Sequence, residues 1–243
     1  MIEIILLLFA GFAAGLVGAT AGGGGGIISF FALIFLGLPI QNAVAINRLG
    51  DLGVYPLSLK NFFESKKINF PIVIQIIPLA VIGGTLGAIL LVVIDSSHLN
   101  WIIPLILFFI LVFLLLKKDV GVKQGKKHSV WPITYFISAI YSGFFVGFTG
   151  IIAVASLTFF RGMKMIEANA TNLVANFIIG IIGSIIFIFA GLVDFSLVLP
   201  LFLGNLFGGW IGSKLVLKKG NRWARLVVIV VLLTAIIKLV FFP

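Results

Sequence analysis

Apolar runs of about 15 to 24 residues recur along nearly the entire chain, and a helix needs roughly 20 such residues to cross a bilayer. Hydrophobic residues make up 61% of the 243 residues and charged residues only 10%, so there is too little polar surface to cover a water-soluble globule. Open strands cannot cross a bilayer, because their backbone groups would stay unpaired in lipid. The sequence therefore predicts an all-α polytopic membrane protein with about 8 to 10 transmembrane segments, forming a single membrane domain over residues 1–243.

The apolar runs place the helical segments at about residues 4–21, 23–37, 40–60, 70–94, 100–116, 131–149, 150–160, 166–190, 195–216 and 223–242. The second and seventh segments are short, at about 15 and 11 residues, against the roughly 20 that a span needs. Two arrangements stay open for them. Each is either a short or broken crossing, or one arm of a hairpin that enters the membrane and returns to the side it came from.

The two halves of the chain resemble each other at one offset of 125 residues, which holds over about 45 residues. The stretch 42–47 aligns with 167–172, and the stretch 83–87 aligns with 208–212. Internal repeats of this kind are typical of secondary transporters. We therefore predict two repeats of about five helical segments each. The first repeat covers 1–117, a basic loop covers 118–130, and the second repeat covers 131–243.

The distribution of positive charge predicts how the two repeats are oriented. Most of the 17 Lys and Arg residues fall in four places: Lys60, Lys66 and Lys67; Lys117, Lys118, Lys123, Lys126 and Lys127; Arg161 and Lys164; and Lys214, Lys218, Lys219, Arg222 and Arg225. The positive-inside rule puts these loops in the cytoplasm. The neutral loop at 95–100 aligns with the basic loop at 218–222, so equivalent loops lie on opposite sides. We therefore predict repeats of inverted topology, with both termini outside.

Gly22, Gly23, Gly24, Gly25 and Gly26 follow one another at the start of the second segment. Each glycine inside a helix costs roughly 1 kcal/mol relative to alanine, so five in a row do not serve helix stability. They serve either close helix packing or an opened helix whose backbone N–H groups point at an anion. For the spaced pairs Gly11/Gly15 and Gly83/Gly87 we expect close packing.

The third segment of each repeat carries polar residues at membrane depth, where such residues are expensive and usually functional. Asn47, Arg48 and Asp51 lie in the first repeat, and Asn172 and Asn176 lie at the equivalent four-residue spacing in the second. Inverted symmetry would bring them together near the midplane. A guanidinium is a planar fork of donors that suits oxyanions, and Asp51 is a candidate for proton coupling. Alternatively, Arg48 pairs with Asp51 and only ties helices together.

Thr20 and Thr149 occupy equivalent positions and either supply hydroxyls to this site or bond back to their own helices. The chain has no Cys and only two His, and we find no Ser/His/acid set and no metal-spaced cluster. We therefore expect no enzymatic activity, no cofactor and no metal site. The basic residues lie in loops without interleaved aromatics, so we expect no nucleic-acid partner.

Several motifs together resemble the sulfite exporter TauE/SafE family, also called the toluene sulfonate uptake permeases. They are the glycine run, the pattern G-L-P-x-x-x-A-x-A-x-N from Gly37 to Asn47, the central basic loop and the second half that echoes the first. The resemblance implies transport of sulfur-containing anions across the bacterial inner membrane, and it supports site roles for the glycine run, Asn47 and, through the repeat, Asn172. The chain departs from the family pattern in its second half, where Gly147-Phe148-Thr149-Gly150 holds only two glycines.

The sequence thus predicts a multi-pass secondary transporter for sulfite, thiosulfate, sulfoacetate or another sulfonate, working by alternating access in the lipid bilayer. Protons or another ion would drive it, and it could form a homo-oligomer. The alternatives are a channel-like pore, a transporter for another small anion such as a carboxylate, and a membrane scaffold that transports nothing.

Overall fold

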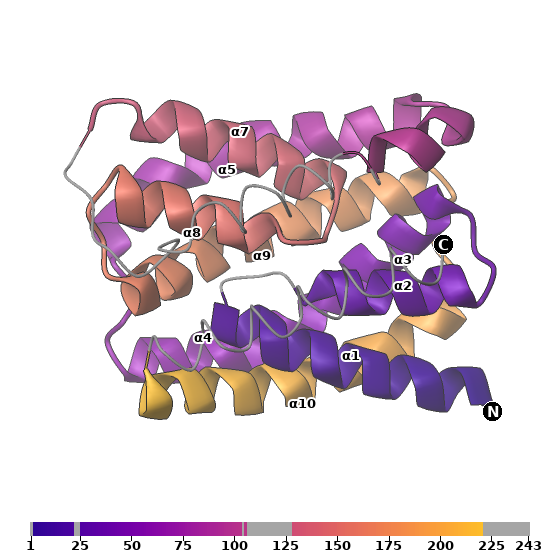
Figure 1. The fold of residues 1–243 in the computed structure, drawn as a ribbon, viewed down its shortest axis with the longest axis horizontal. Coiled ribbons are helices and arrows are strands. Elements are labelled where there is room, and N and C mark those ends of the chain that lie inside the picture. Colours follow the sequence, from indigo (N-terminus) through magenta and orange to yellow (C-terminus); the bar gives the residue numbers. More distant parts are fainter. Residues whose placement is uncertain (1, 22–24, 104, 106–127, 221–243) are drawn as a thin grey trace.

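The computed structural model describes residues 2–21, 25–103, 105 and 128–220, and all of the regular structure in these ranges is helical (Figure 1). The helices are α1 (Ile2–Ala21), α2 (Gly26–Phe35), α3 (Ile40–Asp51), the 3₁₀ helix η1 (Leu52–Val54), α4 (Tyr55–Glu64), α5 (Phe70–Val93), α7 (Trp131–Phe144), α8 (Thr149–Phe159), α9 (Met165–Phe189) and α10 (Phe195–Lys219). The predicted helical segments in these ranges are confirmed. Three predicted parts of the chain lie wholly or mostly outside the described residues. They are the segment at 100–116, the basic loop at 118–130 and the last predicted segment.

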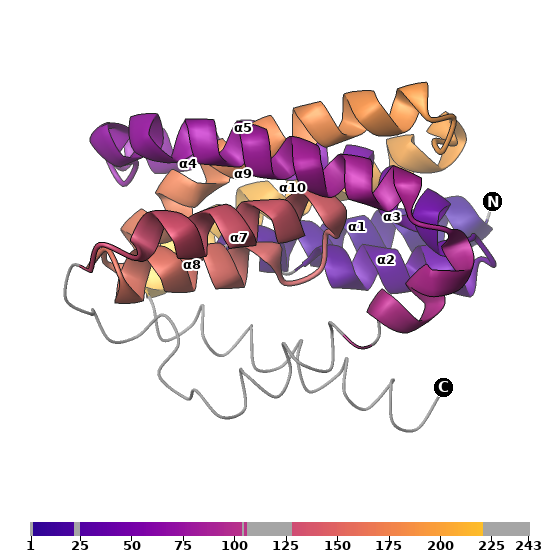
Figure 2. The same cartoon turned by 90° about the horizontal axis from the view of Figure 1, so that it is seen from above.

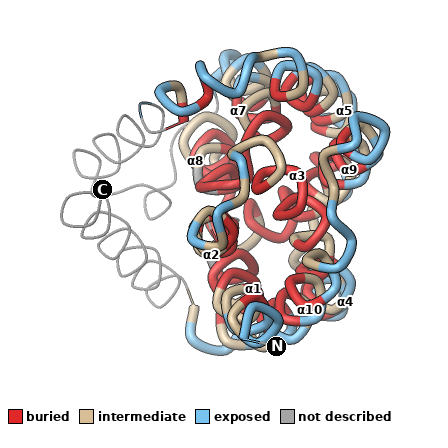
Figure 3. The backbone as a smooth tube through the Cα atoms, turned by 90° about the vertical axis from the view of Figure 1, so that its right-hand side faces the viewer, coloured by how far each residue is buried: buried red, intermediate tan, exposed pale blue. Residues whose placement is uncertain are grey.

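Four of the described helices, α1, α5, α9 and α10, are long and apolar enough to cross a membrane. The helices run along the long axis of the molecule in two perpendicular views (Figures 1 and 2). In the end-on view, buried backbone lies toward the middle and exposed backbone at the periphery (Figure 3). The exposed positions include large apolar side chains such as Ile74, Phe189 and Phe207, as lipid-facing surfaces require. The polytopic all-α class is therefore confirmed.

Glycines bring two pairs of parallel helices into close contact. A Cβ on Gly11 of α1 would lie 2.5 Å from the Leu201 carbonyl oxygen of α10, and one on Gly83 of α5 would lie 2.8 Å from the Ala139 Cβ of α7. Gly15 and Gly87 make equally close approaches to α10 and α7. The packing role predicted for these two glycine pairs is correct, and the backbones approach as small residues allow.

Some contacts also recur at the offset of 125 residues. Gly84 of α5 meets Ile179 of α9, where an added Cβ would lie 2.9 Å from the Ile179 side chain. The equivalent Gly209 of α10 meets Val54 of η1. A Cβ added to Gly209 would lie 2.8 Å from the Val54 carbonyl oxygen. These matching contacts agree with the sequence repeat. The inverted orientation of the two repeats stays a prediction.

The loops gather at the two ends of the molecule according to charge. At one end, Asn42 Nδ2 donates to the Leu192 carbonyl at 3.1 Å and Gln41 Nε2 to the Ile94 carbonyl at 2.8 Å, so three neutral loops meet. The other end holds three basic parts of the chain (Figure 1): the loop after α4, the loop after α8, and the C-terminal end of α10. We call these the neutral end and the basic end.

The short helices α2 and α8 each form one arm of a hairpin. The His128 N–H, just before α7, donates to the Phe160 carbonyl just after α8 at 2.8 Å, so α7 and α8 start and finish at the basic end. The turn between them, 145–148, lies inside the molecule, and Phe148 there has a left-handed φ of 59°. α1 and α2 enter likewise from the neutral end (Figure 1). Of the two arrangements left open by the sequence, the structure has the hairpin that returns.

Local signals in the sequence account for where several helices begin. Asn69 caps α5 by accepting from the Ile72 N–H at 3.2 Å, and Asp194 caps α10 by accepting from the Ser196 N–H at 2.9 Å. These two caps are equivalent at the offset of 125 residues, and such side-chain acceptors satisfy otherwise unpaired N–H groups. The hydroxyl and N–H of Ser196 hold the pKa of the Asp194 carboxyl below its usual value.

Candidate functional site

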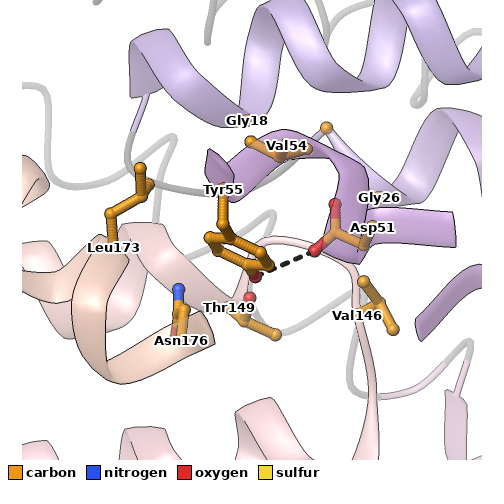
Figure 4. A pocket seen from close by; sticks show the side chains of 10 residues that line it. Gly18, Gly26, Asp51, Val54, Tyr55, Val146, Thr149, Leu173 and Asn176 are labelled. Carbon is orange, nitrogen blue, oxygen red and sulfur yellow. Dashed lines mark hydrogen bonds between the residues drawn. The ribbon is translucent and has the colours of Figure 1, made fainter. Parts of the chain in front are cut away.

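A small cavity lies where the two hairpin turns meet the middle of the molecule (Figure 4). Its lining comes from α1, the glycine run, α3, η1, α4, the 145–148 turn, α8 and α9: Gly18, Gly25, Gly26, Asp51, Val54, Tyr55, Val146, Thr149, Leu173 and Asn176. The volume is about 10 Å³, close to the minimum that holds one water molecule. In this conformation the cavity is too small for an oxyanion.

Two of the five glycines in the predicted run line this cavity. Gly25 also packs on α1, where an added Cβ would lie 2.8 Å from the Gly18 nitrogen, and one on Gly26 would lie 2.6 Å from Val146 Cγ1. Gly22, Gly23 and Gly24 lie outside the described residues. Gly25 and Gly26 therefore permit close packing and border the cavity at once, so the two interpretations of the run are compatible.

The N-termini of α2 and α8 both face the cavity. Gly26 is the first residue of α2 and Thr149 the first of α8, and both belong to the lining. No side chain caps either terminus. The first N–H groups of a helix lack intrahelical partners and carry partial positive charge, so two helix ends offer donors to the same small space.

The three predicted asparagines are buried and form hydrogen bonds with residues of the two hairpins. Asn47 Nδ2 donates to the Gly26 carbonyl at 2.6 Å, and Asn172 Oδ1 accepts from the Tyr135 hydroxyl at 2.8 Å. Of the three, only Asn176 lines the cavity, and its Oδ1 accepts from the Ser142 hydroxyl at 3.4 Å. Among the described residues, Asn47 Oδ1 and Asn172 Nδ2 are buried without a hydrogen-bond partner.

Asn169 of α9 was not among the predicted site residues. Its Nδ2 donates to the Ala19 carbonyl at 3.0 Å and to the Thr20 carbonyl at 3.4 Å. Asn169 thus holds the last turn of α1 while Asn47 holds the first residue of α2, so one amide from each half brackets the glycine run. The repeat did not mark Asn169, because the residue aligned with it is the apolar Val44.

Arg48 is 1% exposed, and its Nη2 donates to the Ser142 and Phe145 carbonyls at the C-terminal end of α7. A cation at this end of a helix is favourable, because the last carbonyls carry partial negative charge. Arg48 does not line the cavity. Its hydrogen bonds tie α3 to the end of α7 through carbonyls, whereas the alternative interpretation expected a pair with Asp51.

Asp51 lies in the cavity wall, and its Oδ2 accepts from the Tyr55 hydroxyl at 3.1 Å (Figure 4). Tyr55 is a site residue that the sequence reasoning missed. Its position four residues after Asp51, across the 3₁₀ turn, was the available signal, since residues at that spacing share a helix face. Asp51 and Tyr55 are the ionisable side chains of the lining.

The two threonines play different parts. The Thr20 hydroxyl bonds back to the Leu16 carbonyl at 2.9 Å and the Val17 carbonyl at 3.0 Å, as the local interpretation held. Thr149 lines the cavity at the start of α8. Within the described part of the chain, no group of His, Asp and Glu is suited to hold a metal ion.

The profile of the family described as Sulfite exporter TauE/SafE matches residues 7–239. The chain is 25% identical over 246 residues to a probable membrane transporter protein of Haemophilus influenzae, covering 99% of this chain and 96% of that protein. It is 26% identical over 231 residues to the probable membrane transporter protein YfcA of Escherichia coli (93% and 85% covered). It is 23% identical over 222 residues to the probable membrane transporter protein YdhB of Bacillus subtilis (88% and 89% covered).

No solved structure matches the chain. The family profile spans nearly the whole sequence, and these relatives are named as transporters, not as enzymes. The helical architecture with four apolar spans is what a multi-pass membrane protein requires. The chain therefore belongs to the sulfite exporter TauE/SafE family of membrane transporters.

Proposed function

We propose that the protein is a secondary transporter that carries a small sulfur-containing oxyanion, such as sulfite, thiosulfate, sulfoacetate or another sulfonate, across the inner membrane. The observation that carries the proposal is the convergence of the α2 and α8 N-termini on one buried cavity. Each terminus acts as roughly half a positive charge, and broken helices in transporters use such ends to hold anions.

The side chains around the two helix ends add donors of the kind an oxyanion needs. Thr149 and Asn176 line the cavity. Asn47 and Asn172 are buried and bond to Gly26 of α2 and Tyr135 of α7. Arg48 contributes its charge from behind the wall, because its guanidinium is engaged by carbonyls of α7. Donors around a cavity shielded from bulk solvent bind an anion more strongly than they would in water.

Asp51 makes the binding of the anion depend on a proton. An ionised carboxylate in the wall would repel an anion only a few ångströms away, and this repulsion is weakly screened in a buried site. Of the charged and titratable groups, Arg48 and Tyr55 face Asp51, while α1, α2, α8 and α9 contribute only uncharged residues to the lining. The anion and a proton on Asp51 would therefore bind together and cross together.

The hairpins supply the two gates that alternating access needs. They enter from opposite ends, and their turns meet at Gly26 and Val146 beside the cavity. Withdrawing one turn would open the cavity toward one end and leave the other closed. In this proposal the basic end is cytoplasmic by the positive-inside rule, and the N-terminal end of α1 lies outside.

Uptake into proteoliposomes tests the proposal with radiolabelled sulfite, thiosulfate, sulfoacetate, sulfate and acetate. We expect the sulfur anions other than sulfate to be transported under an inward proton gradient. Thr149→Val and Asn176→Leu, which remove donors from the lining, should lower transport about tenfold or more, as losing one or two buried hydrogen bonds to a charged ligand implies.

Ser184→Ala is the matched control, because Ser184 is a buried polar residue of α9 outside the lining. It should transport like the native protein. Transport of acetate in preference to every sulfur anion would contradict the substrate class. Native rates in both Thr149→Val and Asn176→Leu would show that the cavity is not the binding site.

A further inference from the structure

Four polar side chains are buried where α10 packs against η1 and α4. They are Ser58 and Asn61 on α4 and Asn205 and Ser213 on α10, with exposed fractions of 0%, 8%, 1% and 0%. Along the interface Asn205 comes first, beside Gly53 of η1, then Ser58, and then Asn61 and Ser213 together. We refer to these four residues as the α4–α10 seam.

The side chains of the seam point into the interface. Asn205 Cβ lies 3.2 Å from where a Cβ on Gly53 would be, and Ser58 Oγ lies 2.9 Å from where one on Gly209 would be. Next along the interface, Asn61 Nδ2 donates to Ser213 Oγ at 2.7 Å. The glycines thus leave room for polar side chains where two helices would otherwise close on each other.

Two of the four side chains lack hydrogen-bond partners. Among the described residues, neither Asn205 Nδ2 nor Asn205 Oδ1 has a partner, and Ser58 Oγ has none. Buried polar groups in native proteins are almost always bonded to protein or to ordered water. A donor, an acceptor and a hydroxyl along one interface are the partners that water molecules require.

The seam extends from the cavity toward the basic end. Val54 lines the cavity, and its carbonyl oxygen lies 2.8 Å from the position of a Cβ on Gly209, next to Ser58. At the far end, Asn61 Nδ2 also donates to the Trp210 carbonyl at 3.2 Å, and the Lys214 ammonium lies 4.1 Å from the Trp210 ring. Trp210 and Lys214 are exposed, so the buried Asn61 is one hydrogen bond away from a residue at the surface.

We propose that the α4–α10 seam binds a file of water molecules that carries protons between the Asp51 cavity and the basic end. This inference rests on the proposed proton coupling at Asp51. When the carboxylic acid of Asp51 releases its proton to water at the cavity, one proton leaves the file at the basic end, so the file itself gains and loses nothing. The hydroxyls and the Asn205 amide hold the water molecules in place.

Proton-coupled flux and anion exchange separate this role from a structural one. Reconstituted protein with a trapped pH dye reports protons moved with sulfite under an imposed gradient. Exchange of internal for external sulfite needs no proton to leave Asp51. In Ser58→Ala and Asn205→Leu we expect net proton-coupled sulfite flux to fall about tenfold, as for an interrupted proton relay, while exchange stays within twofold of the native rate.

Thermal stability supplies the second readout. Replacing a buried polar side chain that has no hydrogen-bond partner by an apolar one leaves the stability unchanged or raises it. We therefore expect Asn205→Leu to lose coupling but to melt at or above the native melting temperature. Ser184→Ala is the matched control, because Ser184 Oγ is also buried without a partner among the described residues, yet it lies on α9.

Each outcome decides the inference. If Ser58→Ala and Asn205→Leu both keep the native proton-coupled sulfite flux, the seam is not a proton path. The same conclusion follows if the control Ser184→Ala loses as much of this flux as they do. Loss of exchange together with coupling in Ser58→Ala also overturns the inference, because the defect would then be in anion binding. If the native protein moves sulfite without protons, coupling at Asp51 fails and the path fails with it, whereas absence of transport of every sulfur anion tested contradicts the proposed function itself.

Discussion

Arg48 is a single buried charge that lies outside the lining of the cavity. Its guanidinium bonds to carbonyls at the end of α7, where it holds the hairpin turn that carries Val146 into the cavity wall. A cation placed this way satisfies acceptors that lack helical partners and still offsets negative charge on an anion nearby. The sequence offered two roles for Arg48, contact with the anion or a pair with Asp51 on the same helix, and neither anticipated its bonds to α7.

We therefore predict that Arg48→Met lowers thermal stability and weakens anion binding without abolishing it. Leaving buried carbonyls without a donor costs about 1–3 kcal/mol. Ligand binding raises the melting temperature by mass action, so the rise caused by added sulfite measures binding in the purified protein. We expect that rise to persist in Arg48→Met. Its disappearance there, with recovery in Arg48→Lys, would show instead that the charge binds the anion directly.

At the scale of elements, the two hairpins differ in the way they make room for each other. The α1–α2 hairpin uses glycines at its turn, whereas the α7–α8 hairpin uses the 145–148 turn with Phe148 in the left-handed region. The turns touch at Gly26 and Val146. The glycine run is thus one side of an asymmetric contact, because the second half supplies a bulky partner.

Gly26→Ala tests that contact. The new methyl group would lie 2.6 Å from Val146 Cγ1 and 2.8 Å from the Val146 carbonyl oxygen, and such overpacking typically costs about 1–3 kcal/mol. We expect a lower melting temperature and slower sulfite transport. Gly183→Ala is the control, because its nearest neighbour is 3.7 Å away and alanine stabilises a helix by roughly 1 kcal/mol. Equal melting temperatures for both variants would contradict a tight contact between the turns.

At the scale of the whole molecule, the charge of the loops follows the two ends of the helix bundle. The neutral loops meet through Gln41 and Asn42, and the basic loops after α4 and α8 lie at the opposite end with the C-terminal end of α10 (Figure 1). The structure thus places the neutral 95–100 loop and the basic end of α10 at opposite ends, as inverted repeats require. Which end faces the cytoplasm is a prediction from charge.

Cysteine labelling tests the orientation directly, because the chain has no native Cys. His98 and Lys218 are both exposed. A membrane-impermeant maleimide should label His98→Cys in intact cells and Lys218→Cys only after the membrane is opened. Reversed labelling would contradict the assignment of the cytoplasmic face. Labelling of both positions from one side would contradict the inverted arrangement of the repeats.

The sequence by itself determined the membrane class, the helix positions and the polar residues at membrane depth. Hydrophobicity and helix-breaking glycines act within a few residues, so they can be read without the fold. The repeat also anticipated that Asp51 and Asn176, equivalent at 125 residues, would meet, and both line the cavity.

Only the tertiary structure decided which of these residues share the cavity and what the others do. Segments that are apolar all round carry no signal for their rotation about the helix axis, so the sequence did not show that Arg48 turns toward α7 or that Tyr55 turns toward the cavity. Asn169 contacts α1 and Asn205 contacts η1, and in each case the two partners are more than 140 residues apart in the chain. Such contacts exist only once the helices have packed.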